Sequence, residues 1–148
     1  MDAIFIQCQQ WRALYARRST QHWPVFFELL VEANKSWAKN AAALVVFVSR
    51  KTFDHGGEPS RTHSYDTGAA WQNFALQGWR QGLVVHGMEG FDYERARAQL
   101  CIPDEFQVEA MAAVGKSGPK EDLPSCSVLT QTASMRQEID CKMPSNYS

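Results

Sequence analysis

Apolar and polar residues alternate along the first part of the chain in patterns that predict both strands and helices. Residues 41–48 are continuously apolar and rich in β-branched side chains, which is typical of a central strand buried on both faces. Apolar positions at helical spacing predict one helix over residues 23–33 and another over residues 64–81. The other expected elements are strands over 11–16, 83–86 and 106–114, and a helix over 93–100 that follows Asp92 as its N-cap.

Three breaks separate these elements. Residues 51–63 contain two adjacent glycines and a proline, which predicts a loop. The run from Trp37 to Asn40 ends the first helical pattern, and Gly87-Met88-Glu89-Gly90 predicts a tight turn between a strand and a helix. The alternation of strands and helices predicts a sandwich of the α+β or α/β type, with helices that cover a sheet.

The composition changes after Gly115. The 148 residues, of which 45% are hydrophobic, suit one globular domain. Residues 116–148 are rich in Pro, Ser, Thr and Gln, and they predict a poorly packed C-terminal extension. We therefore expect one α+β domain over residues 1–115, followed by that extension.

Charge and the lack of sorting signals narrow the classes of function. Fifteen Lys and Arg against 16 Asp and Glu give a formal net charge of -1, which does not favour nucleic-acid binding. The longest apolar run, residues 41–48, is shorter than the roughly 20 residues of a membrane span. The N-terminus lacks the basic start of a signal peptide, and the four cysteines form no C-x-x-C pair. We expect a cytoplasmic protein with reduced cysteines and with no nucleic-acid or membrane partner.

Side chains that could catalyse a reaction are few. His55 and His63 could bind a metal with Asp54 or Asp66, but the spacing of the histidines matches no standard site, and solvated loop residues are the alternative. His86 ends a strand beside a glycine, where a general acid or base is conceivable. The chain has no G-x-S-x-G nucleophile motif, no dinucleotide fingerprint in a strand–helix context and no Walker lysine.

The segment from Gly87 to Gly90 is the most informative candidate. Two glycines allow main-chain N–H groups to approach a flat ligand closely, and the helix after Asp92 directs its positive end toward the same place. An anionic or electron-accepting ring could be stabilised there, and a plain tight turn is the alternative. Separately, the helix over residues 64–81 is apolar over a wide arc, which indicates a core position or a subunit interface.

Five segments in order carry a resemblance to a known family. They are Trp37-Ala38-Lys39-Asn40-Ala41, Tyr65-Asp66-Thr67-Gly68-Ala69-Ala70, Gly87-Met88-Glu89-Gly90-Phe91-Asp92, Leu100-Cys101-Ile102-Pro103-Asp104-Glu105 and Ala112-Ala113-Val114-Gly115-Lys116. Together they resemble the flavin-dependent nitroreductase family, over roughly residues 9–124.

The resemblance implies an α+β fold with a mixed, mostly antiparallel sheet flanked by helices. It also implies a homodimer with FMN bound at the interface, which passes electrons from NAD(P)H to nitroaromatics, quinones or similar acceptors. The main-chain N–H near Glu89 or Gly90 is then expected to hydrogen-bond flavin N5, so no side chain is the chief catalyst. The cofactor-binding residues implied are Gln7, Gln9, Gly87, Met88, Glu89 and Gly90.

The chain departs from the family pattern at both ends. It lacks the N-terminal helix whose Arg-rich motif holds the FMN phosphate, and it ends at Ser148 without the closing basic pair. In the stretch that matches the Ser-x-x-Asn-x-Gln-Pro-Trp motif, Gln9 and Trp11 agree, whereas Gln7 and Gln10 differ. Charge-assisted donors hold phosphates, so their loss supports an alternative: a degenerate, non-catalytic nitroreductase-like module for binding or dimerisation.

Overall fold

The computed structural model describes residues 9–118. Gln7 and the segment from residue 119 onward lie outside the described residues, so the predicted cofactor contact at Gln7 and most of the predicted C-terminal extension lie outside them too. Within residues 9–118, no helix is long and apolar enough to cross a membrane.

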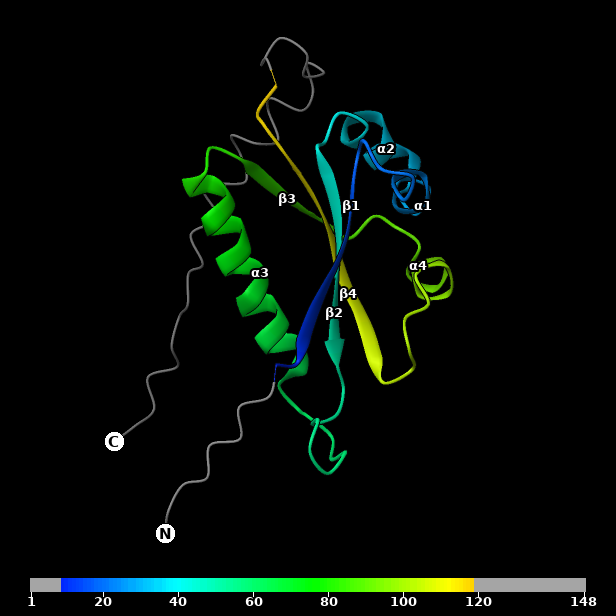
Figure 1. Ribbon diagram of the computed structural model, residues 1–148, viewed down its shortest axis with the longest axis vertical. Helices are drawn as coiled ribbons and strands as arrows, with labels where there is room; N and C mark the ends of the chain where they lie inside the picture. The colour runs from blue at the N-terminus through cyan, green and yellow to red at the C-terminus, as the bar shows by residue number, and fades with distance from the viewer. Residues whose placement is uncertain (1–8, 119–148) are drawn as a thin grey trace, which may run out of the picture. The chain divides into compact units, whose positions relative to one another are not determined.

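Four strands form one sheet at the centre of the fold (Figure 1). Their order is β1-β2-β4-β3, and each neighbouring pair is antiparallel. Helix α3 lies along one face of this sheet, while α1, α2 and α4 lie on the other side (Figure 1). This confirms the α+β prediction. The strands are β1 (Trp11–Arg17), β2 (Ala43–Arg50), β3 (Val84–Met88) and β4 (Phe106–Gly115), and the helices are α1 (Trp23–Phe27), α2 (Glu32–Ala38), α3 (His63–Arg80) and α4 (Tyr93–Gln99).

Strand β2 is buried on both faces, as its unbroken apolar sequence predicts. Leu44 and Val46 face the larger core cluster, to which α1, α2 and α4 contribute Phe26, Ala38 and Ala96. The alternate residues Val45 and Phe47 face the other side and pack with Trp71 and Ala112. Phe47 also meets Phe74 of α3 edge to face, with ring centroids 5.7 Å apart. A strand between two layers of helices can only be stable if both faces are apolar, and β2 meets that condition.

The single helix predicted over residues 23–33 is wrong. Helix α1 ends at Phe27 and α2 begins at Glu32. Between them Leu30 forms an isolated antiparallel bridge with Phe91, and the Val31 N–H donates to the Gly90 carbonyl at 3.1 Å. Both leucines of this link, Leu29 and Leu30, are buried. Pairing with the segment after β3 therefore prevents a continuous helix here. The predicted end of the helical pattern at Trp37 corresponds to the end of α2 at Ala38.

Helix α3 confirms the prediction over residues 64–81 to within one residue at each end. Its Gly78 lies directly against β3, because a Cβ atom there would be 2.6 Å from Val85 Cγ2. Gly68, in the same helix, would meet nothing within 4 Å. The two glycines of one helix therefore differ in what surrounds them, and they form a matched pair for mutation.

We expect Gly78→Ala to lower the free energy of unfolding by about 1–3 kcal/mol, because the added methyl overpacks the contact between α3 and β3. Gly68→Ala should raise it by about 0.5–1 kcal/mol, because alanine has the better helix propensity and the space is open. Urea unfolding followed by circular dichroism measures both changes. Stabilisation by both substitutions would show that the contact of Gly78 with Val85 is not a close one in solution.

Helix α4 begins as predicted, with Asp92 as its N-cap. The Asp92 Oδ1 accepts a hydrogen bond from the Arg95 main-chain N–H at 2.9 Å. The Arg95 guanidinium in turn donates to the Glu28 carbonyl at 3.0 Å, which links α4 to the end of α1. The Asp92 N–H donates to the Leu29 carbonyl at 2.8 Å. Hydrogen bonds therefore hold the segment between β3 and α4 in place, and the candidate site lies at this segment.

Candidate functional site

The segment from Gly87 to Gly90 is not a four-residue turn. Gly87 and Met88 belong to β3, where they pair with Ala112 and Met111 of β4. The predicted turn is therefore wrong for its first half, because the ladder with β4 continues to Met88. Only Glu89 and Gly90 lie beyond the end of the strand.

The two glycines make room for side chains of this chain. A Cβ atom at Gly87 would be 2.9 Å from the Trp71 indole ring, and one at Gly90 would be 2.7 Å from Asn34 Nδ2. Side chains of the same chain therefore lie beside both glycines, and the expectation that main-chain N–H groups approach a flat ligand there stays a prediction. Gly87 is needed so that Trp71 can lie against β3, and Gly90 is needed so that Asn34 can reach the main chain.

At Glu89 and Gly90 the main-chain carbonyls accept hydrogen bonds from this chain, whereas the main-chain N–H groups donate none within the described residues. The Gly90 carbonyl accepts from the Val31 N–H at 3.1 Å and from Asn34 Nδ2 at 2.9 Å. The Glu89 carbonyl accepts from the Phe91 N–H at 2.8 Å. Within residues 9–118, no hydrogen bond is found from the N–H of Glu89 or of Gly90. A main chain held by its carbonyls thus presents two N–H groups that a bound acceptor could use.

A cavity of about 440 Å³ adjoins this segment, between the first half of α3, the end of β3 and the middle of β4. Its lining includes the side chains of Trp71 and Tyr93 as well as Gly87, Met88 and Glu89. The Trp71 Nε1 is buried and has no hydrogen-bond partner in the part of the chain that the structure describes. A buried N–H without an acceptor is uncommon in native proteins, and at a cavity wall it indicates a place for a ligand acceptor. The remaining lining residues are Phe47, Ser64, Thr67, Gly68, Glu109 and Ala110.

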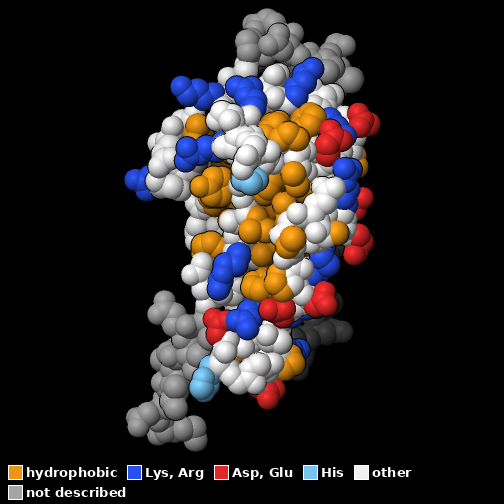
Figure 2. Space-filling view, turned by 45° about the vertical axis from the view of Figure 1, so that its right-hand side comes forward, with side chains coloured by type: hydrophobic (Ala, Val, Ile, Leu, Met, Phe, Trp, Pro, Cys, Tyr) orange, Lys and Arg blue, Asp and Glu red, His pale blue; other side chains and the backbone are white. Residues whose placement is uncertain are grey.

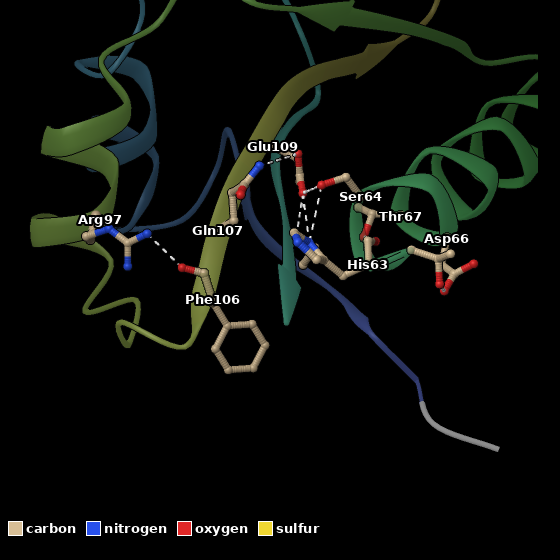
Figure 3. Close-up of polar contacts among 10 residues, drawn as sticks. His63, Ser64, Asp66, Thr67, Arg97, Phe106, Gln107 and Glu109 are labelled. Atoms are coloured by element: carbon tan, nitrogen blue, oxygen red, sulfur yellow. Dashed lines mark hydrogen bonds and ion pairs between the residues drawn. The ribbon is translucent and has the colours of Figure 1, made fainter. Parts of the chain in front are cut away.

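A polar cluster that the sequence did not reveal forms one end of this cavity (Figure 3). Glu109 Oε1 accepts from the hydroxyls of Ser49 and Ser64, the latter at 2.7 Å, and Gln107 Nε2 donates to Glu109 Oε2 at 3.2 Å. His63 Nδ1 lies 2.7 Å from Ser49 Oγ and 3.7 Å from Glu109 Oε1. Ser49 is fully buried, so it cannot act as a nucleophile on a substrate. The cluster instead fixes the position of the Glu109 carboxylate.

Negative charge dominates the cavity. Burial, and then the carboxylates of Glu89 and Glu109, raise the pKa of the Tyr93 phenol above its usual value. The phenol therefore stays neutral over the physiological range of pH. No Lys or Arg is among the residues that line the cavity. Any charge that enters it meets two carboxylates and no fixed cation.

The other predicted site residues lie elsewhere. Gln9 is exposed before β1, where its carbonyl accepts from Arg12 Nη1 at 2.8 Å, and it does not line the cavity. His86 meets Trp37 edge to face, with ring centroids 4.8 Å apart, and does not line the cavity either. His63 contacts the Ser49 hydroxyl and the Glu109 carboxylate, and within the described residues it makes no hydrogen bond or ion pair with the side chain of His55 or Asp66. Within residues 9–118, no group of three or more His, Cys, Asp or Glu side chains could hold a metal ion, so the alternative with His55, His63 and Asp66 has no site there.

A second feature is the apolar surface of α3. Four of its large side chains are exposed: Tyr65 (79%), Trp79 (75%), Leu76 (51%) and Phe74 (38%). On the face drawn in Figure 2, hydrophobic side chains also gather in a band down the middle, with charged side chains along its margins. Exposed apolar surface of this extent is typical of proteins that bind another protein chain.

Comparisons with known proteins show what this chain is similar to. A solved structure described as an oxidoreductase containing FMN is 38% identical to this chain; the match covers 94% of this chain and 72% of that one, with a TM-score of 0.78. An FMN-dependent nitroreductase of Clostridium difficile R20291 shares the fold, with a TM-score of 0.59 at 16% identity over 83% of this chain and 72% of that one.

A curated relative in Mycolicibacterium smegmatis, the "Uncharacterized 15.4 kDa protein in ask 5'region", is 34% identical over 92 residues. That match covers 60% of this chain and 58% of the relative, so the chain spans less than two thirds of the relative's length. The sequence pattern of the nitroreductase family itself matches residues 6–116. That range includes all four strands and all four helices of the described residues, and it is more than half of the chain, so the protein belongs to the nitroreductase family.

Proposed function

We propose that this protein is a flavin-dependent oxidoreductase that binds FMN where β3 ends and passes electrons from NAD(P)H to a nitroaromatic, a quinone or a similar acceptor. The observation that carries the proposal is the pair of unused main-chain N–H groups at Glu89 and Gly90, beside a cavity. The membership of the nitroreductase family and the FMN-containing relative at 38% identity support it.

The residues at this place fit a flavin ring. The edge of an isoalloxazine offers ring nitrogens and carbonyl oxygens as hydrogen-bond acceptors, and the site offers donors without acceptors. These are the main-chain N–H groups of Glu89 and Gly90 and the buried indole N–H of Trp71. When bound, FMN would supply the hydride and electron transfer itself, and the protein would supply binding and orientation.

The neighbouring residues keep these donors in place. Val31 and Asn34 hold the Gly90 carbonyl, and the ladder with β4 holds the residues just before Glu89. Donors that are fixed before the reaction need no reorganisation when charge develops on a bound acceptor, which is how preorganised main-chain groups lower a barrier. The indole of Trp71 and the phenol of Tyr93 form walls of the cavity and would limit access of water.

We further propose a homodimer, in which the apolar face of α3 packs against a second copy. Its exposed residues Trp79 and Leu76 support this, because exposed apolar side chains gain free energy when a partner covers them. Gln7 and Gln9 remain proposed cofactor ligands. We place the protein in the cytoplasm, where NADH and NADPH are available.

The test is the absorption spectrum of the purified full chain, with and without added FMN. We expect flavin bands that stay with the protein through gel filtration at the elution volume of a dimer. NAD(P)H should bleach these bands, and a nitroaromatic should restore them. A colourless protein that does not take up FMN, and whose melting temperature FMN leaves unchanged, would favour the non-catalytic module instead.

A further inference from the structure

The carbonyl of Gly90 accepts two hydrogen bonds from residues far away in the sequence. One comes from the Val31 N–H at 3.1 Å and the other from the side-chain amide of Asn34, through Nδ2, at 2.9 Å. The Asn34 side chain is partly buried, and a Cβ atom on residue 90 would be 2.7 Å from its Nδ2. The lack of a side chain at Gly90 therefore makes room for this amide.

The next peptide groups continue from this carbonyl to the candidate site. The Gly90 carbonyl and the Phe91 N–H belong to one peptide group, and that N–H donates to the Glu89 carbonyl at 2.8 Å. A hydrogen bond between residues two apart closes a γ-turn. The Glu89 carbonyl shares its peptide group with the Gly90 N–H, from which no hydrogen bond is found within residues 9–118. Two consecutive hydrogen bonds therefore connect the Asn34 amide to a main-chain donor that has no acceptor in this part of the chain.

Consecutive hydrogen bonds of this kind strengthen one another. A carbonyl that accepts a hydrogen bond draws electron density from the N–H of its own peptide group, and that N–H becomes a better donor. The Asn34 amide is the first donor of the series and the Gly90 N–H is the last. The N–H of Glu89 belongs to the peptide group of the Met88 carbonyl and lies outside the series. Asn34 therefore acts on one of the two unused donors at the site and not on the other.

We propose that Asn34 is a positioning residue for the bound flavin, and that it acts through the Gly90–Phe91 peptide group to strengthen the Gly90 N–H as a hydrogen-bond donor to the ring. The inference rests on the proposed function, because it takes the acceptor to be FMN. A ring that gains electrons becomes a better acceptor, so a stronger donor stabilises reduced FMN more than oxidised FMN. Asn34 does not line the cavity, so it raises the midpoint potential of the flavin through the main chain alone.

The midpoint potential of FMN bound to the full chain tests the inference. Asn34→Leu replaces the amide by a side chain of similar shape that has no donor. Because one charge-assisted hydrogen bond loses part of its strength, reduced FMN should bind about two- to fivefold more weakly relative to oxidised FMN. For a two-electron couple this change corresponds to a potential about 10–20 mV more negative, measured by equilibration with a reference dye. Asn34→Ala removes the same donor without adding bulk, and it decides if the leucine variant does not fold.

Val31→Ala is the matched control. The Val31 side chain also lies against Gly90, since its Cγ2 would be 3.0 Å from a Cβ atom there. The alanine variant loosens this packing but keeps the main-chain N–H that donates to the Gly90 carbonyl. It should leave the midpoint potential unchanged even where it lowers the melting temperature, because no hydrogen bond of the series is lost.

A second measurement needs no flavin. The sequence has nine glycines, and Gly90 is the only one that follows a glutamate. Isotopic labelling of the glutamate carbonyl carbon and the glycine nitrogen therefore identifies the Gly90 amide in the NMR spectrum of the flavin-free full chain. We expect its proton signal to move upfield in both Asn34 variants, because the peptide group is less polarised, and to keep its position in Val31→Ala.

Three results would each overturn the inference. They are a Gly90 signal that stays in place in the Asn34 variants, a midpoint potential that these variants leave unchanged, and an equal change of potential in Asn34→Leu and Val31→Ala, which would show an effect of packing alone. The proposed function fails by a different result, namely a protein that takes up no FMN. In that case the Gly90 signal of the flavin-free chain still tests whether Asn34 polarises this donor.

Discussion

Leu44→Ala is expected to lower the free energy of unfolding by about 2–5 kcal/mol, the range typical of a leucine truncated in a core. Leu44 is fully buried in β2, the strand that lies between β1 and β4. Its side chain faces the larger core cluster, where α1, α2 and α4 meet the sheet. Helices on one side and strands on both edges surround the lost atoms, so the cavity can collapse only in part.

Urea unfolding of the wild type, Leu44→Ala and Leu44→Met measures this effect. Leu44→Met keeps the volume and should cost less than about 1.5 kcal/mol. Val84→Ala, at a residue of β3 that is 46% exposed, provides the surface control and should stay within about 0.5 kcal/mol of the wild type. A loss below 1 kcal/mol for Leu44→Ala would contradict the placement of β2 at the centre of the core.

Glu89→Pro is expected to lower the rate of flavin-dependent turnover with a neutral acceptor about 10²- to 10³-fold. Proline has no main-chain N–H, so the substitution removes the donor that we propose for flavin N5, and loss of one such donor has an effect of this size in enzymes that use them. The fold should tolerate proline there, because β3 is an edge strand, Met88 before it is extended, and the Glu89 N–H has no acceptor among residues 9–118.

Glu89→Gln is the matched control, because it keeps the main-chain N–H and changes only the side chain. It should lose far less turnover with the neutral acceptor than the proline variant. Stopped-flow measurement of flavin reduction and reoxidation, together with melting temperatures of both variants, separates an effect on catalysis from one on folding. Full turnover by a well-folded Glu89→Pro variant would show that the Glu89 N–H has no part in the mechanism.

Local patterns in the sequence predicted most of the fold. The apolar run before Arg50, the helix with two glycines and the cap at Asp92 all depend on near neighbours, and the structure confirms each of them. The continuous helix through Leu30 is wrong, because its helical spacing competes with a bridge to Phe91 that no local pattern reveals. The sequence-based prediction of this helix thus failed where segments far apart in the sequence pair with each other.

The same limit applies more strongly to the site. The binding of a flat ligand at the segment from Gly87 to Gly90 stays a prediction, and the sequence did not reveal that Trp71 and Asn34 lie beside its two glycines. The cluster around Glu109 was missed entirely. Ser49, His63 and Glu109 belong to three elements, and their spacing along the chain matches no motif. The one sequence signal was a polar residue in an otherwise apolar or amphipathic element: Ser49 near the end of β2, His63 at the start of α3 and Glu109 within β4.

The order of the strands has a consequence for synthesis on the ribosome. Strand β2 pairs with β1, which precedes it, and with β4, which is the last strand of the described residues. Until β4 has been synthesised, the edge of the highly apolar strand β2 that will pair with it has main-chain N–H and C=O groups without partners. That edge could pair with a strand of another nascent chain. Pairing of strands that lie far apart in the sequence slows folding. A chaperone would therefore help this protein most during that period.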